Sequence, residues 1–132
     1  MVELSPEVRR LFEEPNFVSL ATVMEDGSPH VSPVWVALED GRILVNTVVG
    51  RRKERNMRRD PRVALSLFDQ QDPYSRVEIR GRVVEFVEGD VAERQIDELS
   101  KKYYGYEPYP DHSPESPRVI VKIEPEHVHT RL

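Results

Sequence analysis

The 132-residue sequence contains no cysteine and no long apolar segment. The absence of cysteine excludes disulfide bonds, thiolate metal sites and cysteine nucleophiles, and it fits a reducing compartment. No apolar run approaches the roughly 18 residues that a membrane-spanning helix needs. The first residues also lack the basic and apolar stretches of a signal peptide. We therefore expect a cytoplasmic protein with no membrane partner.

Several motifs of catalysis and nucleotide binding are also missing. The sequence has no His-Glu-x-x-His helix, no G-x-S-x-G elbow, no P-loop lysine motif and no G-x-G-x-x-G turn. Hydrolase, nucleotidase and Rossmann-type assignments therefore lack support. His127 and His129 lie two residues apart in a predicted strand, but no third ligand accompanies them, so we expect no metal site.

The composition is that of a globular protein with a richly charged surface. Hydrophobic residues make up 38% and charged residues 33% of the chain, which argues against a disordered protein. No repeat or linker divides the sequence, and its length suits one domain, so we expect a single domain over residues 1–132. A domain of this size gains stability from a partner subunit.

Positive charge is concentrated in one segment. Residues 51–59 hold six of the 19 basic side chains and carry a formal charge of +5, whereas the rest of the chain carries −10. This reversal indicates a polyanionic partner bound at one place. A solvated helix that pairs with the carboxylates of an acidic protein is the alternative. Nucleic acid is disfavoured as a partner because the acidic surface would repel a duplex and no aromatic array accompanies the basic residues.

Helical signals occur in three places. Ser5 caps a first short helix that ends near Pro15. The basic segment after Gly50 forms the second helix, which stops before Pro61 because proline disfavours helical geometry in the preceding residue. The third helix spans residues 90–103 and begins at a capping box formed by residues 90 and 93.

Alternating apolar residues and turn signals predict six or seven strands. The expected strands cover residues 17–24, 29–38, 43–47, 62–68, 75–87, 118–123 and 127–132. The first three form a meander of hairpins, and the last two are hinged at residues 124–126. Gly81 marks a bend or a close backbone approach within the fifth strand. Six or seven strands arranged in hairpins, with few helices, suggest a closed or partly closed β-barrel.

Three of these segments together resemble a known family. They are the hairpin from Phe17 to Val36, the strand that ends in Asn46-Thr47, and the basic helix followed by Asp60-Pro61-Arg62. The combination resembles the split β-barrel flavin and deazaflavin proteins of the pyridoxamine 5′-phosphate oxidase class, and more narrowly their coenzyme F420-dependent oxidoreductase branch. The resemblance covers residues 17–129 and is strongest over residues 17–68.

The resemblance implies a mainly β protein with a few helices, built as a split β-barrel of the FMN-binding type with a Greek-key-like antiparallel barrel. It also implies a homodimer that binds its cofactor in grooves between the subunits. The implied activity is hydride transfer between the deazaflavin and a small electron-poor organic molecule. Because the cofactor carries that chemistry, no catalytic residue is assigned. The alternatives are an FMN-dependent pyridoxamine-phosphate-oxidase-like protein and a non-catalytic flavin- or deazaflavin-binding protein.

The resemblance places the phosphate of coenzyme F420 near Arg51 and Lys53. Asn46 and Thr47 lie at the end of the preceding strand, and Asn56 follows one helical turn later. Guanidinium and ammonium groups suit both a phosphodiester and the oligoglutamate tail of this cofactor. The tail would be guided by the remaining arginines of the helix, Arg55, Arg58 and Arg59. The single phosphate of FMN can use the same Arg51 and Lys53.

The second strand is expected to run along the flavin-like ring. His30, Ser32 and Val34 alternate onto one face of this strand, so Ser32 and the backbone near Pro33 and Val34 can hydrogen-bond the ring. His30 as an exposed turn residue is the alternative. Trp35 is expected in the core or in a subunit interface.

A loop rich in tyrosine and proline follows the third helix. Its tyrosines can form an aromatic wall for substrate or simply pack over the barrel, and we favour packing. These residues are Tyr103, Tyr104, Tyr106 and Tyr109.

Overall fold

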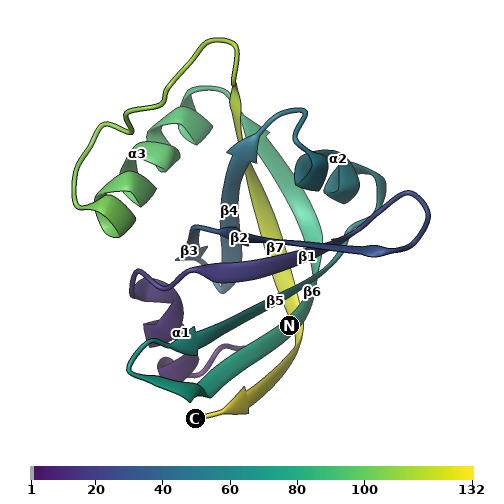
Figure 1. Cartoon of the computed structure of the whole chain (residues 1–132), viewed down its shortest axis with the longest axis vertical. Helices are drawn as coiled ribbons and strands as arrows, with labels where there is room; N and C mark the ends of the chain where they lie inside the picture. Colours follow the sequence, from purple (N-terminus) through teal and green to yellow (C-terminus); the bar gives the residue numbers. More distant parts are fainter. Residues whose placement is uncertain (1) are drawn as a thin grey trace.

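The computed structural model describes residues 2–132, which form one curled antiparallel sheet of seven strands and three helices (Figure 1). The strands are β1 (Val18–Val23), β2 (Pro29–Val34), β3 (Val36–Glu39), β4 (Arg42–Val48), β5 (Arg62–Asp69), β6 (Asp72–Glu88) and β7 (Arg118–Arg131). The helices are α1 (Pro6–Glu13), α2 (Arg52–Arg59) and α3 (Asp90–Tyr104). None of the helices in the described chain has the length and apolar character needed to cross a bilayer.

The split β-barrel predicted for this chain is confirmed by the order of the strands, β2-β1-β5-β6-β7-β4-β3. The two outermost strands, β2 and β3, are consecutive in the chain and are separated only by Trp35. Because one residue joins the two edges of the sheet, the sheet must curl until those edges approach each other at Trp35. The prediction of one strand over residues 29–38 is therefore wrong, as is the simple meander. Two hairpins, β1-β2 and β3-β4, instead lie at opposite ends of the sheet.

The two longest strands, β6 and β7, form the spine of the sheet. Gly81 confirms the predicted close approach, since a Cβ atom on this residue would lie 2.6 Å from the backbone oxygen of Glu124. The register shifts there, and Gly81 lies opposite Pro125. The bulge lets β7 pass this proline without ending its ladder. The predicted pair of C-terminal strands is thus a single strand.

The ends of α1 and α2 agree with the capping and proline signals in the sequence, whereas the start of α3 does not. The Ser5 hydroxyl caps α1 by accepting a hydrogen bond from the Val8 amide at 3.3 Å, and α2 ends at Asp60 as predicted. The predicted capping box at α3 is wrong. Gly89 is the N-cap, with a φ of 86°, and the Glu93 carboxylate instead accepts a hydrogen bond from the Arg118 amide at 2.8 Å.

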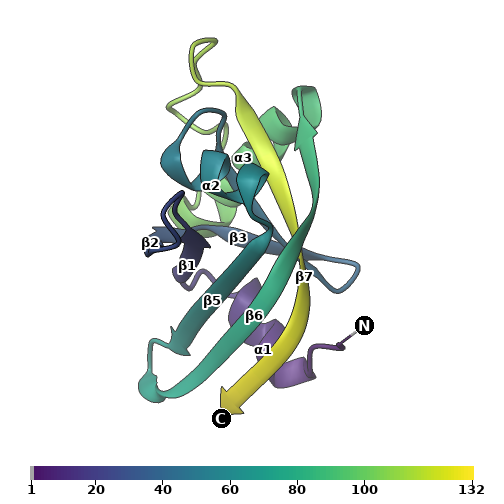
Figure 2. The same cartoon turned by 90° about the vertical axis from the view of Figure 1, so that its right-hand side faces the viewer.

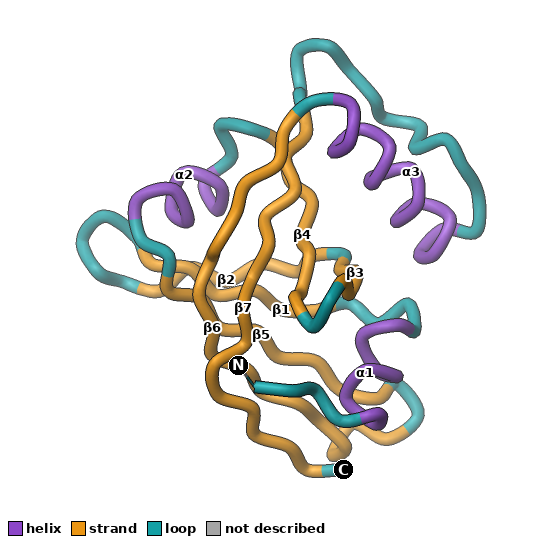
Figure 3. Tube along the Cα trace, turned by 180° about the vertical axis from the view of Figure 1, so that it is seen from behind, coloured by secondary structure: helices purple, strands orange, loops and turns teal. Residues whose placement is uncertain are grey.

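The main core fills the inside of the curl. It includes the apolar face of α1, Met57 of α2, and inward-facing residues from all seven strands. Helices α2 and α3 flank the upper parts of β4, β6 and β7 on opposite sides (Figures 1 and 3). Figure 2 shows β5, β6 and β7 in front with α1 behind their lower parts, so no helix covers the outer face of these strands there.

Candidate functional site

A cavity of about 180 Å³ lies between α2 and α3, at the corner where β2 passes into β3. The strands contribute Pro33, Val34, Asn46, Thr47 and Arg118, the helices contribute Lys53, Ile96 and Tyr104, and the connecting segments contribute Phe17, Trp35, Arg51 and Tyr109. Pockets that enclose a whole drug-sized ligand usually measure about 300–1,000 Å³. This chain by itself therefore encloses only part of a larger ligand.

Three cations converge on this cavity without a carboxylate partner. Burial lowers the pKa of Lys53, and the positive charges of Arg51 and Arg118 lower it further. Arg118 is buried as well, and its side chain donates to the Tyr109 hydroxyl at 3.1 Å. Within residues 2–132 none of these three side chains forms an ion pair. Arg51 is exposed, Lys53 is half-buried and Arg118 is buried. Grouping positive charges around buried ones is costly, and an anion in the cavity would offset that cost.

The other arginines of the basic segment are different, because most of them are neutralised by the protein itself. Arg58 contacts Glu54 at 2.7 Å and Glu88 at 2.9 Å. Arg52 and Arg59 both approach Glu25, at 3.7 and 3.8 Å. The basic segment thus contains two groups of cations: Arg51 and Lys53 face the cavity, whereas Arg52, Arg58 and Arg59 pair with carboxylates of the protein itself.

Asn46 and Thr47, adjacent on β4, have different surroundings. The Asn46 amide donates to the Ala92 carbonyl at 2.9 Å and to Gln95 at 2.8 Å, so it ties β4 to α3. Its carbonyl oxygen also accepts a hydrogen bond from Arg118 at 3.5 Å. The buried Thr47 hydroxyl has no hydrogen-bond partner among the described residues. A buried hydroxyl without a partner is costly, so Thr47 is suited to bind a polar ligand atom.

The predicted site residues divide into two sets. Six of them line the cavity, namely Pro33, Val34, Asn46, Thr47, Arg51 and Lys53. Asn56 does not, because it is fully buried and donates to the Thr22 hydroxyl at 3.0 Å. His30 and Ser32 on β2 pair with Thr22 and Leu20 of β1 and do not line the cavity. Each of the two has a buried polar side-chain atom without a hydrogen-bond partner in the described chain.

Aromatic side chains form a further wall of the cavity. The Trp35 ring stacks on Tyr103 with centroids 5.2 Å apart and meets the edges of Tyr104 and Tyr109 at 4.7 and 6.1 Å. The Tyr103 hydroxyl donates to the Asn16 carbonyl at 2.8 Å, so this tyrosine packs as expected. Tyr104 and Tyr109 instead line the cavity together with Trp35.

Sequence reasoning did not assign Phe17, Trp35, Ile96 or Arg118 to this site. Of these four, Arg118 had a signal in the sequence, because it directly precedes the apolar run Val119-Ile120-Val121. An arginine at the head of a buried strand needs a specific role, since arginine is almost never fully buried without a partner.

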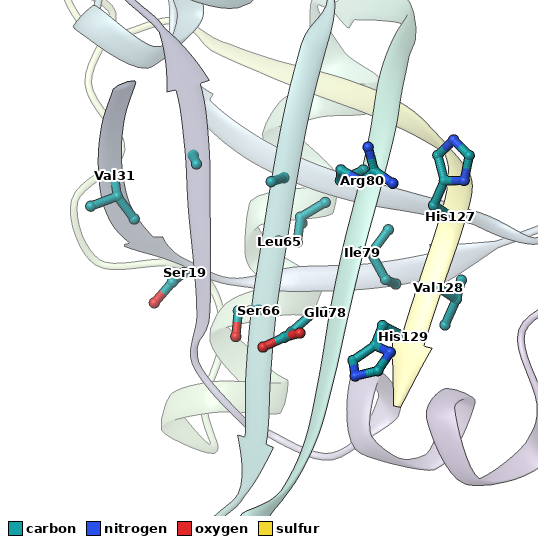
Figure 4. Close-up of a pocket in the computed structure, with 12 residues that line it drawn as sticks. Ser19, Val31, Leu65, Ser66, Glu78, Ile79, Arg80, His127, Val128 and His129 are labelled. Carbon is teal, nitrogen blue, oxygen red and sulfur yellow. The ribbon is translucent and has the colours of Figure 1, made fainter. Parts of the chain in front are cut away.

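A second hollow, of about 540 Å³, lies on the outer face of the sheet. Figure 4 shows Ser19, Ser66, Glu78 and His129 crossing four strands in a row, as their pairing register requires. The floor on β1 and β5 has small side chains, whereas β6 and β7 contribute charged residues and histidines. No group of three or more His, Cys, Asp or Glu side chains that could hold a metal ion is found within residues 2–132.

Comparison with known proteins identifies the family to which this architecture belongs. The profile described as pyridoxamine 5′-phosphate oxidase matches residues 4–132. The chain belongs to the pyridoxamine 5′-phosphate oxidase family. None of the curated proteins searched matches the sequence.

Solved structures give more detail on this family member. A structure titled F420 Reductase is 28% identical, with a TM-score of 0.84 over 96% of this chain and 98% of that one. A conserved hypothetical protein from Mycobacterium tuberculosis is also 28% identical, with a TM-score of 0.74 over 98% of this chain and 85% of that one. HutZ, titled a heme storage protein from Vibrio cholerae, shares the fold at 20% identity, with a TM-score of 0.68 over 98% and 95% of the two chains.

The residues of this family member fit a flavin-type cofactor with a phosphate group. The unpartnered Thr47 hydroxyl and the unpaired cations around it supply hydrogen-bond donors and positive charge. The N-terminus of α2 lies at this cavity, which Arg51 and Lys53 line. Arg51 is the N-cap residue of α2 and makes no side-chain capping hydrogen bond. Free amides in the first turn of a helix bind phosphate.

Proposed function

We propose that this protein is a coenzyme F420-dependent oxidoreductase that transfers a hydride between the deazaflavin and a small electron-poor organic molecule. The observation that supports it best is the group of three cations, Arg51, Lys53 and Arg118, without carboxylate partners around the unpartnered Thr47 hydroxyl. The likeness to the structure titled F420 Reductase adds to this support.

The cavity residues have distinct proposed roles. Arg51, Lys53 and Arg118 hold the phosphate, with Thr47 donating a hydrogen bond to it. Asn46 does not touch the cofactor directly but holds Arg118 and α3 in place. Arg55 on α2 is exposed, and we assign it to the acidic tail of the cofactor.

The ring of the cofactor is assigned to β2 and the aromatic wall. The deazaflavin supplies the hydride when it is bound. Ser32, His30 and the backbone at Pro33 and Val34 hold and orient the ring, and the unpartnered polar atoms of His30 and Ser32 support this role. The aromatic wall around Trp35 excludes water from the reacting face.

A second copy of the chain is proposed to complete the groove. The cavity wall and the outer hollow are adjacent, because Pro33 of the cavity pairs in register with Ser19, which lines the outer hollow. Phe17 precedes Ser19 by two residues, lines the cavity and is 58% exposed. A subunit docked on the outer face would thus reach the open side of the cavity and cover its exposed apolar residues.

FMN is the alternative cofactor. A cavity of about 180 Å³ with three cations suits a single terminal phosphate as well as a phosphodiester. Arg55, an exposed cation on α2 beyond that cavity, favours the longer anionic cofactor. A protein that is yellow as isolated and releases FMN on denaturation would favour the alternative.

The experiment is a titration of the purified protein with coenzyme F420 and, separately, with FMN, followed by turnover with quinone and nitroaromatic acceptors. We expect micromolar or tighter binding of coenzyme F420 and acceptor-dependent oxidation of its reduced form. No binding at micromolar concentrations would contradict the proposal. Tight binding without turnover of any acceptor would instead indicate a non-catalytic carrier of the cofactor.

A further inference from the structure

His112 lies in the segment that connects α3 to β7, and both nitrogens of its ring face carboxylates. Its Nε2 lies 2.6 Å from Asp97 and its Nδ1 lies 3.1 Å from Glu93. These two acidic residues are one turn apart on α3. The edge of the ring meets Tyr109, with centroids 5.7 Å apart.

This geometry selects the charged form of the imidazole. A neutral histidine has one N–H donor, so it can satisfy only one of the two carboxylates, and its other nitrogen then directs a lone pair at an anion. The imidazolium donates to both. Hydrogen bonding to Asp97 accordingly raises the pKa of His112, with Glu93 adding to the effect and partial burial opposing it.

The same two carboxylates also hold the cavity residues in place. Asp97 accepts a hydrogen bond from the Tyr109 amide at 2.8 Å, and Glu93 accepts one from the Arg118 amide at 2.8 Å. The Arg118 guanidinium lies over the Tyr109 ring at 4.9 Å and donates to its hydroxyl. His112, Tyr109 and Arg118 thus share one pair of acidic anchors, and two of the three line the cavity.

We propose that His112 is a pH-dependent positioning residue for the anion site. As an imidazolium it clamps the segment of residues 105–117 onto α3 and holds Tyr109 and Arg118 against the cavity. Its deprotonation releases one carboxylate, loosens the segment and weakens anion binding. The clamp follows from the contacts of His112, Asp97 and Glu93 within this chain. Its effect on the cofactor rests on the proposed function.

Trp35 provides a direct readout of the clamp, because it is the single tryptophan of the chain and its ring contacts Tyr109. We expect its fluorescence in the cofactor-free protein to show a His112-dependent transition between pH 5.5 and 9, above the ordinary histidine pKa of 6.5. Burial lowers the pKa of Lys102, which lies over the Tyr103 ring, to about 8, and the contribution of this lysine is common to all variants. The His112-dependent transition is therefore the difference between the pH profiles of wild type and variant. H112Q and H112R should both abolish this transition, and H127Q, on the far face of β7, should keep it. A pH profile that is the same in the wild type, H112Q and H112R would overturn the clamp.

The affinity for coenzyme F420 at pH 6 and pH 9 tests the coupling to the site. We expect wild-type binding to weaken about fivefold across this range. H112R, with a permanent cation, should bind tightly at both pH values, whereas H112Q should bind weakly at both. Titration of Lys53 is common to all three proteins, so it cancels in this comparison.

The results separate the two proposals. If H112R behaves like H112Q, charge at this position does not hold the cavity residues and the positioning role is wrong. If the fluorescence transition depends on His112 but neither coenzyme F420 nor FMN binds, the clamp is supported and the proposed function is overturned.

Discussion

Basic side chains that are neighbours in the sequence differ in their partners, and this difference decides their expected roles. Lys53 faces Arg51 and Arg118 without an ion pair in the described chain, whereas Arg59 approaches the exposed Glu25 at 3.8 Å. We predict that K53A weakens binding of coenzyme F420 by about tenfold or more, because a hydrogen bond to a charged group contributes about 1.5–3 kcal/mol. R59A should change it by less than about threefold. Isothermal titration calorimetry compares the two variants, and equal losses would argue against the assignment of the phosphate to Lys53.

Thr47 provides a test that separates binding from stability. Its buried hydroxyl has no partner among the described residues, so replacing it with a methyl group removes an unsatisfied polar atom. We predict that T47V keeps the free energy of unfolding within about 1 kcal/mol of the wild type or raises it, while cofactor binding weakens. Urea denaturation and a cofactor titration measure the two effects. A large loss of stability with unchanged binding would show that the hydroxyl serves the fold instead.

Part of the site was predictable from single residues and part was not. Arg51, Lys53 and Thr47 were predicted because they lie in one short segment with a recognisable pattern. The position of Arg118 before a buried strand indicates a specific role, but only the pairing of β7 with β4 brings this residue to the cavity. The pairing of Arg58 with Glu88 likewise joins separate elements.

All three helices were predicted at about the right places, because the capping and proline residues that mark helix ends are local in the sequence. The start of α1 follows from Ser5 and Pro6, and the end of α2 follows from Pro61. Strands were harder, because their pairing depends on distant partners. The break at Trp35 and the continuous β7 through Pro125 result from closure of the sheet and from the bulge opposite Gly81. Gly81 was a local signal for the bulge, but nothing local showed that β7 continues through Pro125 or that the strand breaks at Trp35, so alternation alone predicted the wrong boundaries.

The bulge at the β6–β7 junction gives a prediction about stability. A Cβ atom on Gly81 would lie 2.6 Å from the Glu124 backbone oxygen and 3.0 Å from the Ile123 side chain, so the strands must separate to accept it. We predict that G81A lowers the free energy of unfolding by about 2–3 kcal/mol. G27A tests the alternative that any glycine substitution is costly, because Gly27 has a φ of 87° but no atom near its Cβ position. Denaturant unfolding should show a greater loss for G81A, and equal losses would mean that crowding at the bulge is unimportant.

At the scale of the whole molecule, one face of the sheet lacks a partner. Val31 is 65% exposed and lines the outer hollow next to small side chains on β1 and β5. Exposed apolar residues around a hollow indicate an interaction surface, and the cavity needs a further wall on this side. We therefore predict a homodimer in solution.

Light scattering during size-exclusion chromatography tests the dimer. The wild type should have about twice the 15.4 kDa mass of one chain. V31E should shift the mass toward one chain and weaken cofactor binding, because the second subunit completes the groove. V91E is the matched control, since Val91 is 49% exposed on α3 away from the outer face. A wild-type monomer that binds the cofactor as tightly as predicted would contradict this arrangement.

The most direct test of the central claim is a crystal structure of the protein with coenzyme F420. We predict the phosphate within hydrogen-bond distance of Arg51, Lys53 and Arg118, with the Thr47 hydroxyl among its partners and the ring along β2. A cofactor bound with its phosphate outside this group of cations would contradict the account.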